Sequence, residues 1–322
     1  GSATGDEVMA FHHKDPQAVG RNVWAPVVNP LRDPRWGRNE EGYSEDPWLT
    51  GLMGAAYSRG LCGDGGPDGS GVLKTAPTLK HFLAYNNETD RCVTSSGLPP
   101  RVLHEYELKA FRPAIEAGAA VAVMPSYNLV NGRPAHLSPL IESALRTWAR
   151  DDIMVVSDAY APANLTGMQA YHRDLPEAYA HAIKAGLDSF TQDDDDPAAT
   201  LGHIRTALDR GLLTEGDIDR AARHLLSIRV RLGEFDPATP YDQITQDVVN
   251  SPEHRRWPGR RPGSRSHCSR TTASSARLAQ DGRGDRPAGR PPHGGLVQRH
   301  AAVPDNGARR AGRTVRGRSL RG

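Results

Sequence analysis

The sequence is poor in cysteine, in aromatic side chains and in long apolar runs. Its 322 residues include 3 cysteines and 6% aromatic residues. The scattered positions of Cys62, Cys92 and Cys268 predict neither a disulfide framework nor a metal knuckle. No stretch approaches the roughly 18 apolar residues of a membrane span. The chain begins at Gly1 without a basic, apolar leader, as if cut from something longer, so we expect it to hold no targeting information.

Charge of both signs is present, but it is unevenly distributed. Residues 1–254 carry 23 Lys and Arg against 35 Asp and Glu, a balance of −12. Residues 255–322 carry 17 Arg, no Lys, three Asp and no Glu, a balance of +14. Such a step in charge marks a boundary. We therefore predict one domain over 1–240, a linker over 241–255 and a disordered Arg/Gly/Pro-rich tail over 256–322.

The region around this boundary contains one apparent helix start. Ser251, Pro252 and Glu253 resemble a cap, a proline at the first position and an early acid. The run WPGRRPG follows Arg256 at once, so we expect no helix there. Beyond it there is no periodicity, and Gly, Pro, Ser and Arg dominate, a composition that cannot bury a core.

Short apolar runs alternate with helical patterns over residues 20–240. The strand candidates are 23–28, 75–82, 119–127, 153–157 and 187–191. The helix candidates are 102–116, 139–148, 176–185, 201–208 and a segment that begins at the capping box of Thr214 and Asp217. Continuous apolar runs are typical of strands buried on both faces. Repeated strand–helix units predict an α/β fold with a parallel sheet, either doubly wound or closed into a barrel.

Polar residues follow several of these predicted strands. Arg38 lies in the loop after the first strand, and the pair Lys80-His81 closes the second. Tyr127 ends the third, and Asp158 follows the fourth. In a parallel β/α barrel the active site lies at the carboxyl ends of the strands. Cations and hydroxyl donors around one carboxylate would keep it ionised and would hold a polyhydroxylated ligand, so we predict a site around Asp158.

Three segments resemble the signature segments of glycoside hydrolase family 3, the β-glucosidase and β-xylosidase family: VVNPLRDPRWGRNEEGYSEDP, LKHFLAYNNETDR and VVSDA. They occur in the family's order, and the resemblance covers roughly residues 20–255. It implies an incomplete (β/α)8 TIM-type barrel over 1–240, followed by the non-globular basic tail. It also implies that terminal β-linked glucose or xylose is released with retention, from oligosaccharides or aryl β-glycosides and without a cofactor.

The resemblance further implies a role for particular residues. Asp158 occupies the place of the nucleophile, which attacks the anomeric carbon and forms a glycosyl-enzyme that water then hydrolyses. The residues implied to contact sugar hydroxyls are Arg38, Lys80, His81, Arg91 and Tyr127.

Each of these residues also has a purely structural interpretation. Arg38 could form an ion pair with an acid of its own loop, Glu40, Glu41 or Glu45. His81 could be a hydrogen-bonded core histidine, and Tyr127 taken alone would be a packing residue. The whole chain could be a catalytically dead sugar-binding remnant.

No metal site is expected from the sequence. The acidic run Asp193–Asp196 is more typical of a solvated loop than of a calcium site. His12, His13 and His172 lack the spacing of metal ligands.

The chain departs from the family pattern in four ways. Ala159 follows the nucleophile position where the family usually has Trp. The opening of the barrel, with its first strand, is missing. The Pro-Gly-His loop of the N-acetylglucosaminidase branch is also missing, which favours the glucosidase/xylosidase branch. That branch takes its general acid/base from a second α/β domain, which is absent, so we expect this chain to be inactive or impaired.

The tail has an interpretation of its own. After SPEHRR the family continues into a leucine-rich segment, whereas this chain reads HCSRTTASS. Permissible codons for HCSRTTASS, shifted by one base, encode Leu-Leu-Lys-Asn-Asp-Gly-Leu-Leu. We therefore interpret residues from about 256 onward as out-of-frame translation. A basic tail could instead bind RNA phosphates, but this one has a single aromatic residue, Trp257, and no repeated RGG spacing.

Overall fold

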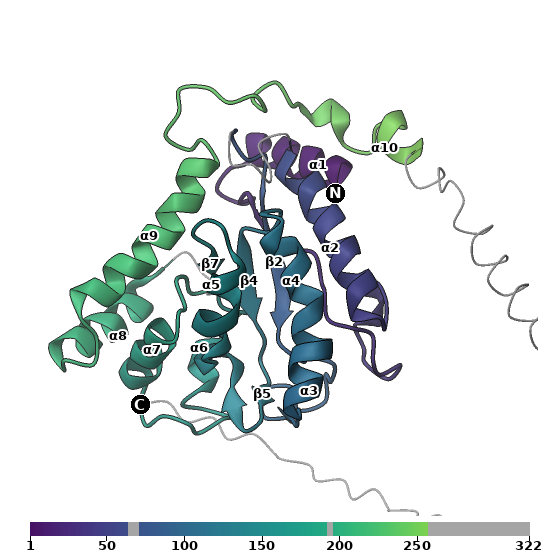
Figure 1. Cartoon of the computed structure of the whole chain (residues 1–322). Coiled ribbons are helices and arrows are strands. Elements are labelled where there is room, and N and C mark those ends of the chain that lie inside the picture. The colour runs from purple at the N-terminus through teal and green to yellow at the C-terminus, as the bar shows by residue number, and fades with distance from the viewer. Residues whose placement is uncertain (64–70, 192–195, 257–322) are drawn as a thin grey trace, which may run out of the picture. The chain divides into compact units, whose positions relative to one another are not determined.

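A computed structural model describes residues 1–63, 71–191 and 196–256 (Figure 1). The chain divides into two compact units, Gly1–Arg260 and Arg261–Gly322, and the second lies outside the described residues. The predictions for the tail, apart from Arg256, and for most of the acidic run Asp193–Asp196 also fall outside them. Within the described ranges, no helix has both the length and the apolar character to cross a membrane.

The centre of the first unit is a parallel sheet. Its strands are β1 (Asn22–Val23), β2 (Ala76–Phe82), β4 (Ala122–Pro125) and β7 (Met154–Val155), in the spatial order β1-β2-β4-β7. A parallel bridge between Val156 and Ser189 continues the series beyond β7. The prediction of an α/β fold with a parallel sheet is confirmed. The spatial order follows the chain order, whereas a doubly wound sheet reverses it at a switch point.

The strands agree with the prediction in place but not always in length. β2 coincides with the predicted strand over 75–82 to within one residue. The first predicted strand is interrupted, because Pro26 has no N–H for the ladder, and it pairs again only where Val27 bridges Lys80. The last predicted strand, over 187–191, forms a single bridge, between Ser189 and Val156. The N–H groups of Asp188 and Ser189 both donate to the carbonyl of Val155.

Helices connect the strands and cover the sheet. They are α1 (Ser2–Lys14), α2 (Pro47–Cys62), α3 (Pro100–Val102), the π-helical η3 (Leu103–Glu107), α4 (Leu108–Glu116), the π-helical η5 (Ile141–Leu145), α5 (Arg146–Trp148), α6 (Ala161–Asn164), α7 (Leu175–Lys184), α8 (Ala198–Asp209) and α9 (Glu215–Arg231). The predicted helices over 102–116 and 139–148 each contain a wide π-helical turn. In Figure 1, α2 and α4 lie side by side next to the sheet. Gly51 permits this close approach, because a Cβ there would lie 2.8 Å from Pro113.

The helix ends follow the local sequence signals. The carboxylate of Asp174 accepts the N–H of Glu177 at the start of α7, and Gly186 follows the end of α7 at a φ of +110°. The predicted capping box of Thr214 and Asp217 starts α9. A small second sheet joins the loops that follow β2 and β4, and its strands are β3 (Ser95–Ser96), β5 (Leu129–Val130) and β6 (Arg133–Pro134).

The expectation of no helix after Ser251 is wrong. α10 (Pro252–Arg256) forms there as a single short helix. It depends on a distant partner, since the ring of His254 lies 2.8 Å from the carboxylate of Glu7 on α1, which also accepts the N–H of Asn250. The segment that we predicted as a linker thus contacts α1.

A buried ion pair fixes the helices behind β7. The side chain of Asp188 is 0% exposed. It binds Arg146 of α5 at 2.9 Å, the ring of His224 of α9 at 2.8 Å and the backbone N–H of Val155 at 2.8 Å. One carboxylate therefore joins two helices to the strand that leads to Asp158.

We expect Asp188→Asn to destabilise the protein by about 3 kcal/mol, because it removes the fully buried charge that binds Arg146 and His224 and leaves Arg146 paired only with the half-exposed Glu142. The matched control is Glu116→Gln, which removes the same charge from an exposed pair with Arg112 and should cost less than about 0.5 kcal/mol. Urea denaturation measures both. Equal losses in the two variants would show that Asp188 is not a structural centre.

Candidate active site

The structure brings three of the predicted site residues together at the carboxyl end of the sheet. His81 lies near the end of β2, Tyr127 follows β4, and Asp158 follows β7. His81 Nε2 is 3.9 Å from Asp158 Oδ2. The Tyr127 hydroxyl donates to the carbonyl of Ala159, at 2.8 Å. The parallel alignment of β2, β4 and β7 thus gathers side chains that are up to 77 positions apart in the sequence.

Arg38 and Lys80 lie close enough to act on the charge of Asp158, but they share a second carboxylate. Arg38 Nε is 2.5 Å from Glu41 Oε1, and Lys80 Nζ is 3.7 Å from Glu41 Oε2. The structural alternative for Arg38 is therefore realised with Glu41. The two cations are held side by side, and Glu41 offsets part of their charge.

Arg91 joins this group through an aromatic ring. Its guanidinium lies 4.5 Å from the ring centroid of Tyr127, a cation–π distance. It also donates to the Tyr85 hydroxyl and to Glu88, each at 3.1 Å. Glu88 accepts a further hydrogen bond from the Trp36 indole, at 2.9 Å. Glu88 therefore ties the loop after β1 to the loop after β2.

The pKa of Asp158 differs in direction from our expectation. We expected nearby cations to favour the ionised form strongly, yet burial raises the pKa of this carboxyl above its usual value. The N–H of Ala159, at 2.8 Å, the nearby Tyr127 hydroxyl and the charges of Arg38 and Lys80 only partly oppose the cost of burial. Burial is the largest cause, and it outweighs the two cations, which also pair with Glu41.

One oxygen of Asp158 remains free of donors. Oδ2 is buried, and no described residue gives it a hydrogen bond. Burial and the nearby cations hold the pKa of His81 well below its usual value, so the ring facing Oδ2 is neutral. A carboxylate oxygen without donors keeps its lone pairs available for attack on an electrophile.

Two buried residues that position the site were not identified as such from the sequence. Asn29 forms two hydrogen bonds with the backbone of His81. Its amide nitrogen donates to the His81 carbonyl at 2.8 Å, and its oxygen accepts the His81 N–H at 2.8 Å. His136 accepts the N–H of Asp158 at 3.4 Å, and burial lowers the pKa of His136 to about 3, so its ring is neutral. Asn29 directly follows a predicted strand, which was a usable signal. His136 lies in a short 3-10 helix, η4 (Ala135–Leu137), and nothing in its neighbours identifies it.

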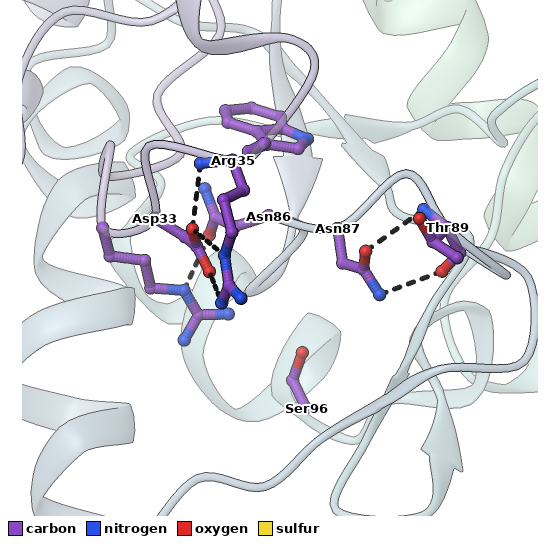
Figure 2. A pocket seen from close by; sticks show the side chains of 8 residues that line it. Asp33, Arg35, Asn86, Asn87, Thr89 and Ser96 are labelled. Atoms are coloured by element: carbon purple, nitrogen blue, oxygen red, sulfur yellow. Dashed lines mark hydrogen bonds and ion pairs between the residues drawn. The ribbon is translucent and has the colours of Figure 1, made fainter. Parts of the chain in front are cut away.

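A separate polar pocket of about 610 Å³ lies on the loops after β1 and β2. Its lining residues are Arg32, Asp33, Arg35, Trp36, Asn86, Asn87, Thr89 and Ser96. Figure 2 shows that Asp33 pairs with Arg35 and that Asn87 bonds Thr89. Neither Asp158 nor any residue predicted to contact sugar lines this pocket. Trp36 connects the two regions, because it lines this pocket and also donates to Glu88, the partner of Arg91.

The family of the chain follows from its sequence as a whole. The model of the glycosyl hydrolase family 3 N terminal domain matches residues 8–228, more than half of the chain. The chain belongs to glycoside hydrolase family 3. The resemblance inferred from the three signature segments is thereby confirmed.

Curated relatives of this family 3 chain include plant and fungal proteins. It is 37% identical over 255 residues to the probable beta-D-xylosidase 7 of Arabidopsis thaliana, which covers 74% of this chain and 32% of the relative. It is 35% identical over 261 residues to the probable exo-1,4-beta-xylosidase bxlB of Aspergillus clavatus, which covers 78% of this chain and 33% of the relative. The chain thus spans about a third of the length of these relatives.

Solved structures of the family resemble this family 3 chain in fold. A GH3 exo-beta-xylosidase (XlnD), in complex with a xylobiose aziridine activity-based probe, matches with a TM-score of 0.72 and 29% identity over 80% of this chain and 33% of the other. A beta-glucosidase from Listeria innocua in complex with glucose matches with a TM-score of 0.63 and 27% identity, over 79% of this chain and 35% of the other. Both comparisons cover about four fifths of this chain.

We expect Asp158→Asn to stabilise the folded chain at about pH 7. Because the folded state binds the Asp158 proton more tightly than the unfolded chain does, stability falls as pH rises from the unfolded pKa, about 3.9, to the raised folded value. Asp158→Asn does not lose stability in this way, because asparagine carries no ionisable carboxyl group. Its melting temperature should exceed that of the parent by a few degrees, since 1 kcal/mol corresponds to about 2–4 °C at this size.

The melting temperatures of the parent and of Asp158→Asn should also be compared over a range of pH. The advantage of Asp158→Asn should shrink as pH falls toward about 4, where both states of the parent begin to bind the proton. Asp209→Asn, at the exposed end of α8, corrects for the general effect of removing one negative charge. An advantage of Asp158→Asn that is absent, or that stays constant with pH, would contradict the effect of burial.

Proposed function

We propose that this chain carries the nucleophile of a retaining β-glycosidase that releases terminal β-linked xylose or glucose. The observation that carries the proposal is the Asp158 carboxylate, 14% exposed and with its buried Oδ2 free of donors, at the carboxyl end of a parallel sheet. Membership of family 3 supports it, as do relatives named β-xylosidases and β-glucosidases. The sequential order of the sheet agrees with an arc of a (β/α)8 barrel, the closed form that we propose for the domain.

In the proposed reaction, Asp158 Oδ2 attacks the anomeric carbon and the bond to the leaving oxygen breaks. Water then cleaves the glycosyl ester, and the two inversions together retain the configuration. Positive charge develops on the sugar ring, and the Asp158 carboxylate stabilises it. The side chains proposed to bind the sugar hydroxyls are Arg38, Lys80, His81, Arg91 and Tyr127.

A retaining enzyme needs a second carboxyl group to protonate the leaving oxygen, about 5 Å from the nucleophile. Glu41 is bound to Arg38 and Lys80, and Glu88 accepts hydrogen bonds from Trp36, Tyr85 and Arg91. These contacts commit both acids to structural roles. We therefore propose that the proton donor belongs to a part of the enzyme other than the described residues, and that this chain alone is impaired.

The dependence on the leaving group tests this proposal. General acid catalysis is worth about 10²–10⁴-fold, but a nitrophenolate leaves without much protonation. We expect the chain to hydrolyse nitrophenyl β-xyloside slowly and to cleave xylobiose at least about 100-fold more slowly still. Asp158→Ala should abolish aryl cleavage, and added azide should restore it by forming the α-xylosyl azide, because a single displacement inverts the configuration.

Two control variants separate the alternatives. Asp209→Asn, on the surface, should hydrolyse the aryl substrate like the parent. Glu88→Gln should lose no more activity on xylobiose than on the aryl substrate. A selective loss on xylobiose would make Glu88 the proton donor and would contradict our assignment. A parent that binds xylose but cleaves no aryl xyloside would indicate a catalytically dead sugar-binding domain.

A further inference from the structure

Two histidines and a glutamate converge at the start of α7, apart from the site around Asp158. His172 lies in the loop between α6 and α7, three residues before α7 begins, and Glu177 and His181 lie one turn apart on α7. His172 Nε2 is 3.2 Å from His181 Nδ1, and the two ring centroids are 4.5 Å apart. One ligand atom from each of the three side chains lies within 4.8 Å of the other two.

The separation of the two ring nitrogens matches a metal site. Zinc binds histidine nitrogen at about 2.0–2.1 Å, so two nitrogens in a tetrahedral site lie roughly 3.3 Å apart. Two neutral imidazoles could also share one hydrogen bond at this distance. The carboxylate of Glu177 would take no part in that bond, because its Oε1 lies 3.8 Å from His172 Nδ1, which is too far for a hydrogen bond.

The surroundings prepare these side chains for a cation. The side chain of His172 is only 6% exposed, so few water molecules compete with a cation for its ring nitrogen. The N–H of Arg173 donates to Glu177 Oε2 at 3.2 Å and so orients the carboxylate. His181 is exposed, so water can reach the open coordination positions.

We propose that His172, Glu177 and His181 bind Zn²⁺ or a similar first-row divalent cation, with water completing the coordination. Imidazole and carboxylate ligands suit such cations. The bound ion would fasten to α7 the loop that starts at Leu165, whose carbonyl accepts the N–H groups of Tyr171 and His172. This loop follows the Asp158 strand end and α6, so the ion steadies the flank of the site and takes no part in the reaction. The linear sequence hides the site, because His172 lies outside the helix that carries the other two ligands.

Titration of the metal-free full-length chain with Co²⁺ and Zn²⁺ tests the site. Co²⁺ should produce the visible absorption of a low-coordinate nitrogen and oxygen site, with one equivalent lost in both His172→Ala and His181→Ala. Zn²⁺ should raise the melting temperature of the parent, because a ligand that binds only the folded state stabilises it. Glu177→Gln should weaken binding at least about tenfold, since a neutral amide is a poorer ligand than a carboxylate.

The matched control is His104→Ala, which removes an exposed histidine from η3. It should bind Co²⁺ and respond to Zn²⁺ like the parent, which separates this site from the other histidines and cysteines of the chain. Since His181 is exposed, His181→Ala should fold even if His172→Ala does not. The proposal is overturned if His181→Ala binds Zn²⁺ as tightly as the parent. It is also overturned if the parent binds no equivalent of metal, or if His104→Ala loses the equivalent that the parent binds.

Discussion

The parallel alignment of β2, β4 and β7 is the constraint on which the site depends. Hydrogen bonds pair Leu79 with Val123, and Val123 with Val155. Parallel strands in register end at the same edge, so the polar residues that follow them meet there whatever their separation in the sequence. The apolar interior of each strand also determines where the backbone stops being buried, and Asp158 lies three residues beyond the last paired residue of β7.

The same arrangement makes the nucleophile position costly. A carboxylate with one oxygen free of donors is poorly solvated, and its raised pKa records this cost. Arg38 and Lys80, the cations that could offset this cost, are also bound to Glu41. The surrounding structure must therefore fix the position of the site residues. His136 does so through the backbone N–H of Asp158, and Asn29 does so through the backbone of His81. Neutral, buried partners fix geometry without adding charge.

Much of this could be predicted from the sequence, because the signals were local. The apolar run over 75–82 gave β2, and the capping box at Thr214 gave the start of α9. The contacts that were missed are long-range. α10 depends on Glu7, more than 240 positions away, and no local pattern selects Glu41 from the three glutamates near Arg38. Burial sets the direction of the Asp158 pKa shift and outweighs the nearby cations, and the burial of a side chain cannot be derived from a strand-end motif.

Covalent trapping tests the central assignment most directly. A dinitrophenyl 2-deoxy-2-fluoro-β-xyloside carries a leaving group that needs no proton donor, and its fluorine slows release of the glycosyl-enzyme. The tryptic peptide 151–173 contains only three acids, Asp151, Asp152 and Asp158. Tandem mass spectrometry should place one fluoroxylosyl group on Asp158, and Asp158→Asn should remain unlabelled. A label on any other carboxylate, or a folded parent that is never labelled, would contradict the account.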